Sequence, residues 1–152
     1  MTTDPIMDEI MAATAVLHGG DRPGGRSRLE AIWSRIANDP APIHECALAH
    51  SMADAQEDVS DELAWDLRAL EAALRCTDAD ARSHSQAFSI AAFMPSLYAN
   101  LAEDYFKLGD LAQSEINLAS ARNLAGDLAD DAYGQLIQRG IERLGRQLDS
   151  YG

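Results

Sequence analysis

Residues 98–121 carry the feature that most constrains the fold of this chain. Large and small side chains recur there at helical intervals on both sides of a glycine: Tyr98, Leu101, Ala102, Tyr105, Gly109, Ser114, Leu118 and Ala121. The first four follow the i, i+3, i+4, i+7 rule, which places them on one helix face. Gly109 accepts the positive φ of a tight reversal, and the small Ala102 lets the next helix approach. The spacing predicts two closely packed antiparallel helices.

The remaining strong segments show the same 3.6-residue period, and none alternates with a period of two. We expect helices over about 5–18, 27–37, 42–55, 60–74, 95–108, 111–125 and 130–148, with Gly19 to Gly25 as a loop. On the fourth helix, a row formed by Leu63, Leu67, Leu70 and Leu74 is expected to be buried. Residues 77–94 are expected to be a packed linker, either a short helix or an extended segment. The predicted class is all-α, with about seven antiparallel helices.

Length and composition are typical of one ordinary domain that needs no disulfide or metal cross-links to fold. The chain has 152 residues, 47% of them apolar, and should bury about 68–70% of its unfolded surface. Its two cysteines, Cys46 and Cys76, are too few for a disulfide framework and are expected to be reduced and buried. No segment approaches the ~20 apolar residues of a membrane span, and no export signal is recognisable at the N-terminus. We therefore expect a cytoplasmic protein.

The charge is strongly negative and unevenly distributed. A net charge of −13 repels phosphate backbones and anionic lipids, which argues against nucleic-acid and membrane partners. Acidic residues dominate 54–80, whereas four arginines gather early: Arg22, Arg26, Arg28 and Arg35. Two interpretations stay open. These are solvated helix faces, or the acidic stretch prefers basic partners.

The residues over 95–126 resemble one tetratricopeptide repeat (TPR). Tyr98 and Leu101-Ala102 stand where that family has an aromatic anchor and Leu-Gly, while Tyr105 and Gly109 match outright. The resemblance implies a single helical-repeat domain over 1–152, a short α-solenoid. Its helical pairs would be 4–38, 42–76 and 95–126, with 77–94 as linker and 128–149 as a capping helix.

In that family the inner faces of the first helices line a peptide-binding groove. Carried onto this chain, the groove comprises Ser96, Ala99, Asn100, Glu103, Phe106 and Lys107, and Trp65 is a further candidate as a groove or interface aromatic. Ala99 and Glu103 on the inner row argue against a carboxylate clamp. A protein or peptide partner with basic or apolar side chains fits better.

Other groupings of reactive residues lack the context that their chemistry needs. Cys46, His50 and Asp54 lie along one helix face, but three ligands spread over two turns cannot converge on one ion. Asp78-x-Asp80 lacks the glycine and distal glutamate of a calcium loop, and Ser83-His84-Ser85 has no nucleophile elbow or oxyanion loop. We expect no enzyme activity, no metal and no cofactor.

The sequence thus favours a non-enzymatic scaffold or adaptor that binds a protein or peptide in a helical groove. One alternative is a sensor with a pocket for a small molecule or peptide between helical pairs. Another is a self-assembling homodimer that docks through the last helix around Gly140.

Overall fold

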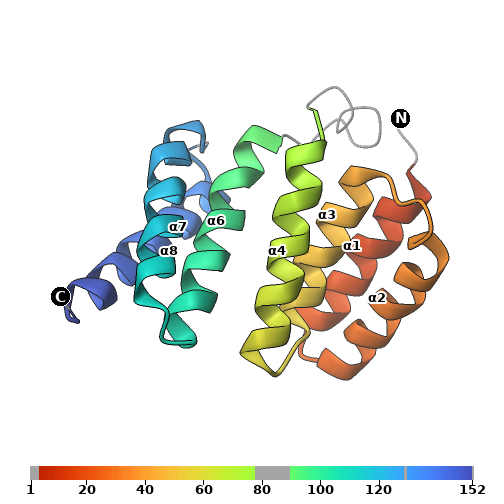
Figure 1. Ribbon diagram of the computed structural model, residues 1–152. Coiled ribbons are helices and arrows are strands. Elements are labelled where there is room, and N and C mark those ends of the chain that lie inside the picture. The colour runs from red at the N-terminus through yellow and green to blue at the C-terminus, as the bar shows by residue number, and fades with distance from the viewer. Residues whose placement is uncertain (1–3, 78–89, 129, 152) are drawn as a thin grey trace. The chain divides into compact units, whose positions relative to one another are not determined.

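The computed structural model describes residues 4–77, 90–128 and 130–151. These residues form seven α-helices and one 3-10 turn, without a strand, so the predicted all-α class is confirmed (Figure 1). The helices are α1 Pro5–His18, α2 Arg22–Ile36, α3 Pro42–Asp54, α4 Val59–Arg75, α6 Ile90–Lys107, α7 Leu111–Leu124 and α8 Ala132–Asp149, with the 3-10 turn η1 at Ala125–Asp127. In this part of the chain, no helix has the length and apolarity needed to cross a bilayer.

The chain divides into two compact units, Met1–Ser89 and Ile90–Gly152. In the first, α1 to α4 lie side by side (Figure 1) and share a core contributed mainly by α1, α2 and α3. The core residues are Ile10, Ala13, Leu17, Leu29, Ile32, Leu48, Met52 and Ala55. Because α1 presents one apolar face and α3 is buried on most of its sides, this unit buries its own core.

The second unit consists of α6, α7, η1 and α8. Its core gathers Ala102 from α6, Leu118 and Ala121 from α7, Ala125 from η1, and Ile141, Leu144 and Leu148 from α8. Ala102 is fully buried, and Gly109 adopts φ +83° in the turn between α6 and α7. The two predicted helices on either side of Gly109 are therefore present, with the predicted glycine turn between them.

Five of the seven helices begin at an aspartate whose carboxylate accepts a main-chain N–H of the first turn. These N-caps are Asp4, Asp21, Asp58, Asp110 and Asp131. An N-cap carboxylate satisfies a donor that has no partner inside the helix, and it lies at the positive end of the helix dipole. The acidic composition therefore contributes directly to where these helices start.

The prediction that 19–25 is a loop was wrong, because α2 begins at Arg22. Asp21 accepts the N–H of Gly24, and Pro23 lies in the first turn, where its missing N–H costs nothing. Gly25 is buried against α1: a Cβ there would lie 2.6 Å from the Cβ of Leu17. Glycine therefore provides close helix packing at this position rather than a flexible loop.

The predicted burial of the leucine row on α4 was also wrong. Leu67 and Leu74 are 42% and 65% exposed, while the alanines at positions 69, 72 and 73 are buried. Small residues on that face let α4 pack closely on α3, so the leucines on the adjacent face stay partly in solvent. Helical periodicity located the helix correctly but did not distinguish its apolar leucine face from its alanine face.

The start of α6 differs from the prediction as well. The helix begins at Ile90 and contains Pro95, which was expected to be its first residue. Pro95 has no N–H to donate to the carbonyl of Ala91. The next residue, Ser96, donates its hydroxyl to the Phe93 carbonyl at 2.7 Å. Of the predicted linker 77–94, residues 90–94 are helical, and residues 78–89 lie outside the described part of the chain.

Candidate functional site

The second unit has a hollow of about 160 Å³ between α6 and α8. Its lining comes from Ala99, Asn100 and Glu103 of α6, from Leu118 of α7, and from Leu136, Ile137, Gly140, Ile141, Arg143 and Leu144 of α8. We call this hollow the α6–α8 groove. It brings three of the predicted groove residues together on one wall.

Helical spacing explains how each wall is built. Asn100 precedes Glu103 by three residues and Ala99 precedes it by four, so all three lie on one side of α6. On the opposite wall, Gly140 follows Leu136 by four residues. A Cβ at Gly140 would meet only a guanidinium nitrogen of Arg143, at 4.0 Å. The absence of a side chain at Gly140 therefore keeps the middle of the groove open.

The groove combines an apolar floor with charged edges. Leu118, Ile141 and Leu144 are buried and form the floor, and Leu136 leaves 59% of its surface exposed at one side. Glu103 on the α6 wall and Arg143 on the α8 wall are both exposed. Within the described residues neither takes part in an ion pair, so both charges are available to a bound molecule.

One polar interaction caps the start of α8, and a second joins that start to α6. The Asp131 carboxylate accepts the N–H of Gly134 at 2.8 Å, and the Tyr133 hydroxyl donates to Ser96 Oγ, also at 2.8 Å. Partial burial raises the pKa of the Tyr133 phenol, so this donor keeps its proton in neutral solution. The first turn of α8 is thereby attached to α6, which defines the spacing of the groove.

The other predicted groove residues of the second unit lie outside this hollow. Ser96 is buried and bonded to Tyr133, while the Phe106 ring packs edge-on against Tyr151 with ring centroids 5.7 Å apart. Lys107 is exposed in the last turn of α6. These three residues therefore lie beside the lining residues on α6 without contributing to the groove.

Trp65 belongs to the first unit. Its ring meets Trp33 edge-on at 5.9 Å, and the guanidinium of Arg68 lies 5.1 Å from the Trp33 ring and 5.5 Å from the Trp65 ring. Arg68 also lies 3.6 Å from the buried carboxylate of Glu45, which receives a 2.6 Å hydrogen bond from Arg75. Trp65 therefore helps to join α2, α3 and α4.

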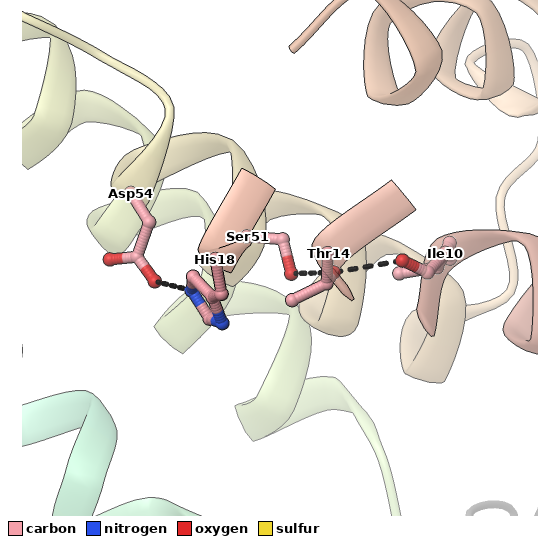
Figure 2. A network of polar contacts seen from close by, with 5 residues as sticks. All are labelled: Ile10, Thr14, His18, Ser51 and Asp54. Atoms are coloured by element: carbon pink, nitrogen blue, oxygen red, sulfur yellow. Dashed lines mark hydrogen bonds and ion pairs between the residues drawn. The ribbon is translucent and has the colours of Figure 1, made fainter. Parts of the chain in front are cut away.

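A ladder of polar contacts joins α1 to α3 (Figure 2). Thr14 Oγ1 donates to the Ile10 carbonyl at 2.8 Å and lies 2.7 Å from Ser51 Oγ. One turn further along, His18 Nε2 lies 3.2 Å from an oxygen of Asp54. Both pairs lie at a helix–helix contact, so they align the two helices.

Of the residues weighed as metal ligands, Cys46 has unfavourable surroundings for that role. Burial raises the pKa of the Cys46 thiol to about 12, and a thiol must lose its proton to bind a metal. Burial lowers the pKa of His50, against the opposing effect of Asp54, which favours its neutral form. The Asp78-x-Asp80 and Ser83-His84-Ser85 patterns lie outside the described residues.

Comparisons with protein-family models, curated proteins and solved structures find no match for this chain.

The sequence pointed to the α6 wall of the groove but not to the α8 wall. For the last helix the sequence predicts a cap over 128–149 and names Gly140 only as a self-docking point, and no pattern singles out Arg143. One signal was available: the apolar stripe of this helix includes both Leu136 and Ile137, which makes it wider than burial against one neighbour requires.

Proposed function

We propose that this protein is a non-enzymatic adaptor that binds a short peptide segment of a partner protein in the α6–α8 groove. The observation that carries the proposal is the open space at Gly140 on the α8 wall, between Glu103 and Arg143, which form no ion pair among the described residues. A TPR-like arrangement of antiparallel helical pairs would present such a groove on its inner surface.

The size of the groove favours a peptide side chain over a small-molecule ligand. Sites for drug-sized ligands usually enclose about 300–1,000 Å³. At about 160 Å³ the groove is smaller and accommodates one apolar anchor residue. This observation weighs against the sensor alternative as far as the second unit is concerned.

The charges define the flanking residues of the occupant. An apolar anchor above Gly140 would place neighbouring peptide residues between Glu103 and Arg143. A lysine or arginine of the peptide would then pair with Glu103, and Arg143 would bind a carboxylate or main-chain carbonyl of the peptide. The favoured ligand is therefore a peptide in which an apolar residue has a basic neighbour. Such a ligand also suits the strongly acidic character of the chain that binds it.

A display library of random peptides tests the proposal. Selection on the wild-type protein should enrich an apolar–basic motif. Gly140→Trp, which fills the groove, should abolish binding of the enriched peptides, and Gly140→Ala should retain it. Glu103→Lys should weaken binding of the peptides that carry the basic residue. Circular dichroism and thermal melting of each variant establish that it is folded.

Two outcomes would refute the proposal. One is peptide binding that Gly140→Trp leaves unchanged, which would place the binding surface elsewhere. The other is a concentration-dependent dimer in sedimentation experiments that Gly140→Trp dissociates. That result would assign the groove to self-assembly, the alternative in which the last helix docks on a second copy.

A further inference from the structure

The first unit has a second hollow, of about 400 Å³, between α1 and α2. Its lining comes from Glu9 and Ala12 of α1 and from Arg28, Ala31, Ile32 and Arg35 of α2. The four α2 residues follow i, i+3, i+4, i+7 and therefore occupy one face of that helix. The hollow has a floor of small and apolar side chains with an arginine at each end of its α2 wall.

The two arginines differ in their partners. Arg35 forms an ion pair with Glu9 across the hollow. Arg28 is exposed and forms no ion pair with any residue that the structure describes, and the nearby Arg26 pairs with Glu30 of its own helix. One guanidinium beside an apolar floor is therefore uncompensated, although the chain has a net charge of −13.

We propose that this hollow, which we call the α1–α2 hollow, binds an acidic amphipathic helix of a partner protein. The proposal depends on charge complementarity and on spacing. Seven residues of α-helix span about 10.5 Å, so Arg28 and Arg35 are about that far apart along α2. Carboxylates at positions i and i+7 of a bound helix match this separation, and apolar residues at i+3 and i+4 then contact Ala12 and Ala31.

The Glu9–Arg35 pair makes the two ends of the hollow respond differently. At the Arg28 end, the incoming carboxylate gains a guanidinium that has no competing carboxylate. At the Arg35 end it must compete with Glu9, which also repels it. Removing the charge of Arg28 should therefore weaken binding, and removing the charge of Glu9 should strengthen it.

The probe is a designed helical peptide of about 16 residues, long enough to form an isolated helix. It carries glutamate at positions i and i+7, leucine at i+3 and i+4, and a fluorescent label. A second peptide has glutamine in place of both glutamates. Fluorescence anisotropy at low salt should show saturable binding of the acidic peptide, and at least fivefold weaker binding of the glutamine peptide.

Four variants of the full chain complete the test. Arg28→Gln should weaken binding of the acidic peptide by roughly two- to fivefold, and Glu9→Gln should strengthen it by a similar factor. Ala31→Trp should block the hollow. The matched control is Arg139→Gln, which removes an exposed arginine of α8 and should have little effect.

The signs of these changes decide the result. Equal weakening by Arg28→Gln and Arg139→Gln would show that only the overall charge matters, and the proposal would fail. It would also fail if Glu9→Gln weakened binding or if the acidic peptide did not saturate. If the wild-type protein formed a dimer that Arg28→Gln dissociated, the occupant of the hollow would be a second copy of the chain. That result would overturn the proposal.

Discussion

The Ser114 hydroxyl of α7 donates a hydrogen bond to the main-chain carbonyl of Ala102 in α6 at 2.6 Å. Both residues are fully buried. A side chain on one helix can reach the backbone of its neighbour only where the side chains between them are small, so this contact marks a close approach of the two helices. It accounts for the small residues at these two positions.

The Ser114 contact predicts different costs for two substitutions. Ser114→Ala should destabilise the protein by about 0.5–1.5 kcal/mol, because it removes one hydrogen bond but keeps the small volume. Ser114→Leu should cost more than Ser114→Ala, because it forces α6 and α7 apart. Urea unfolding followed by circular dichroism measures both. Equal losses would contradict the close contact.

Gly25 and Gly140 should respond to alanine in opposite directions. Gly25→Ala places a Cβ against Leu17 and should destabilise by roughly 1–3 kcal/mol through overpacking. Gly140→Ala meets open space within a helix and should stabilise by about 0.5–1 kcal/mol. Thermal melting of the two variants beside the wild type gives the comparison. A loss of stability in Gly140→Ala would show that the space beside Gly140 is too small for a side chain.

Exposure of Leu67 predicts a small effect of truncating it. Leu67→Ala should cost less than about 1 kcal/mol, whereas Leu29→Ala, in the fully buried core, should cost about 2–5 kcal/mol. Chemical denaturation of both variants checks this contrast. If Leu67→Ala matched Leu29→Ala, the leucine row of α4 would be buried after all.

Stability should decrease in mild acid through His50. Burial lowers the pKa of His50 in the folded state, while its pKa in the unfolded chain is about 6.5. The unfolded state therefore binds the proton more readily, so this contribution is complete above pH ~6.5 and is lost as the pH falls toward the folded-state pKa. His50→Gln should reduce the slope of unfolding free energy against pH between about pH 5 and 7.

The control for the pH prediction is Ser114→Ala, which changes stability without removing a titratable group. Its slope below pH ~6.5 should stay closer to that of the wild type. Urea titrations at several pH values supply the free energies. A slope that His50→Gln leaves unchanged would assign the pH dependence to other groups.

The sequence predicted helix positions well where periodicity and end signals agreed. Gly109 defined the turn before α7, and Pro5 and Pro42 defined the starts of α1 and α3. It failed where packing between helices decided the outcome. Gly25 and the alanines of α4 permit close contacts that a one-dimensional pattern does not distinguish from a loop or a weak face.

The candidate site was predictable only in part, for a similar physical reason. Ala99, Asn100 and Glu103 were predicted because the resemblance to a TPR implies a groove along that face of the helix. Arg143 becomes a groove residue only once α8 is positioned against α6, and that depends on the bond between Tyr133 and Ser96. Long-range contacts of this kind leave no local pattern in the sequence.

The aspartates that cap five helices occur in both units. Each carboxylate places a negative charge at the positive end of its helix, which strengthens the hydrogen bond that it accepts. Replacing one of these aspartates by alanine would therefore weaken the start of its helix and fray the helix from its first turn. Part of this molecule's surplus of negative charge thus determines where its helices begin.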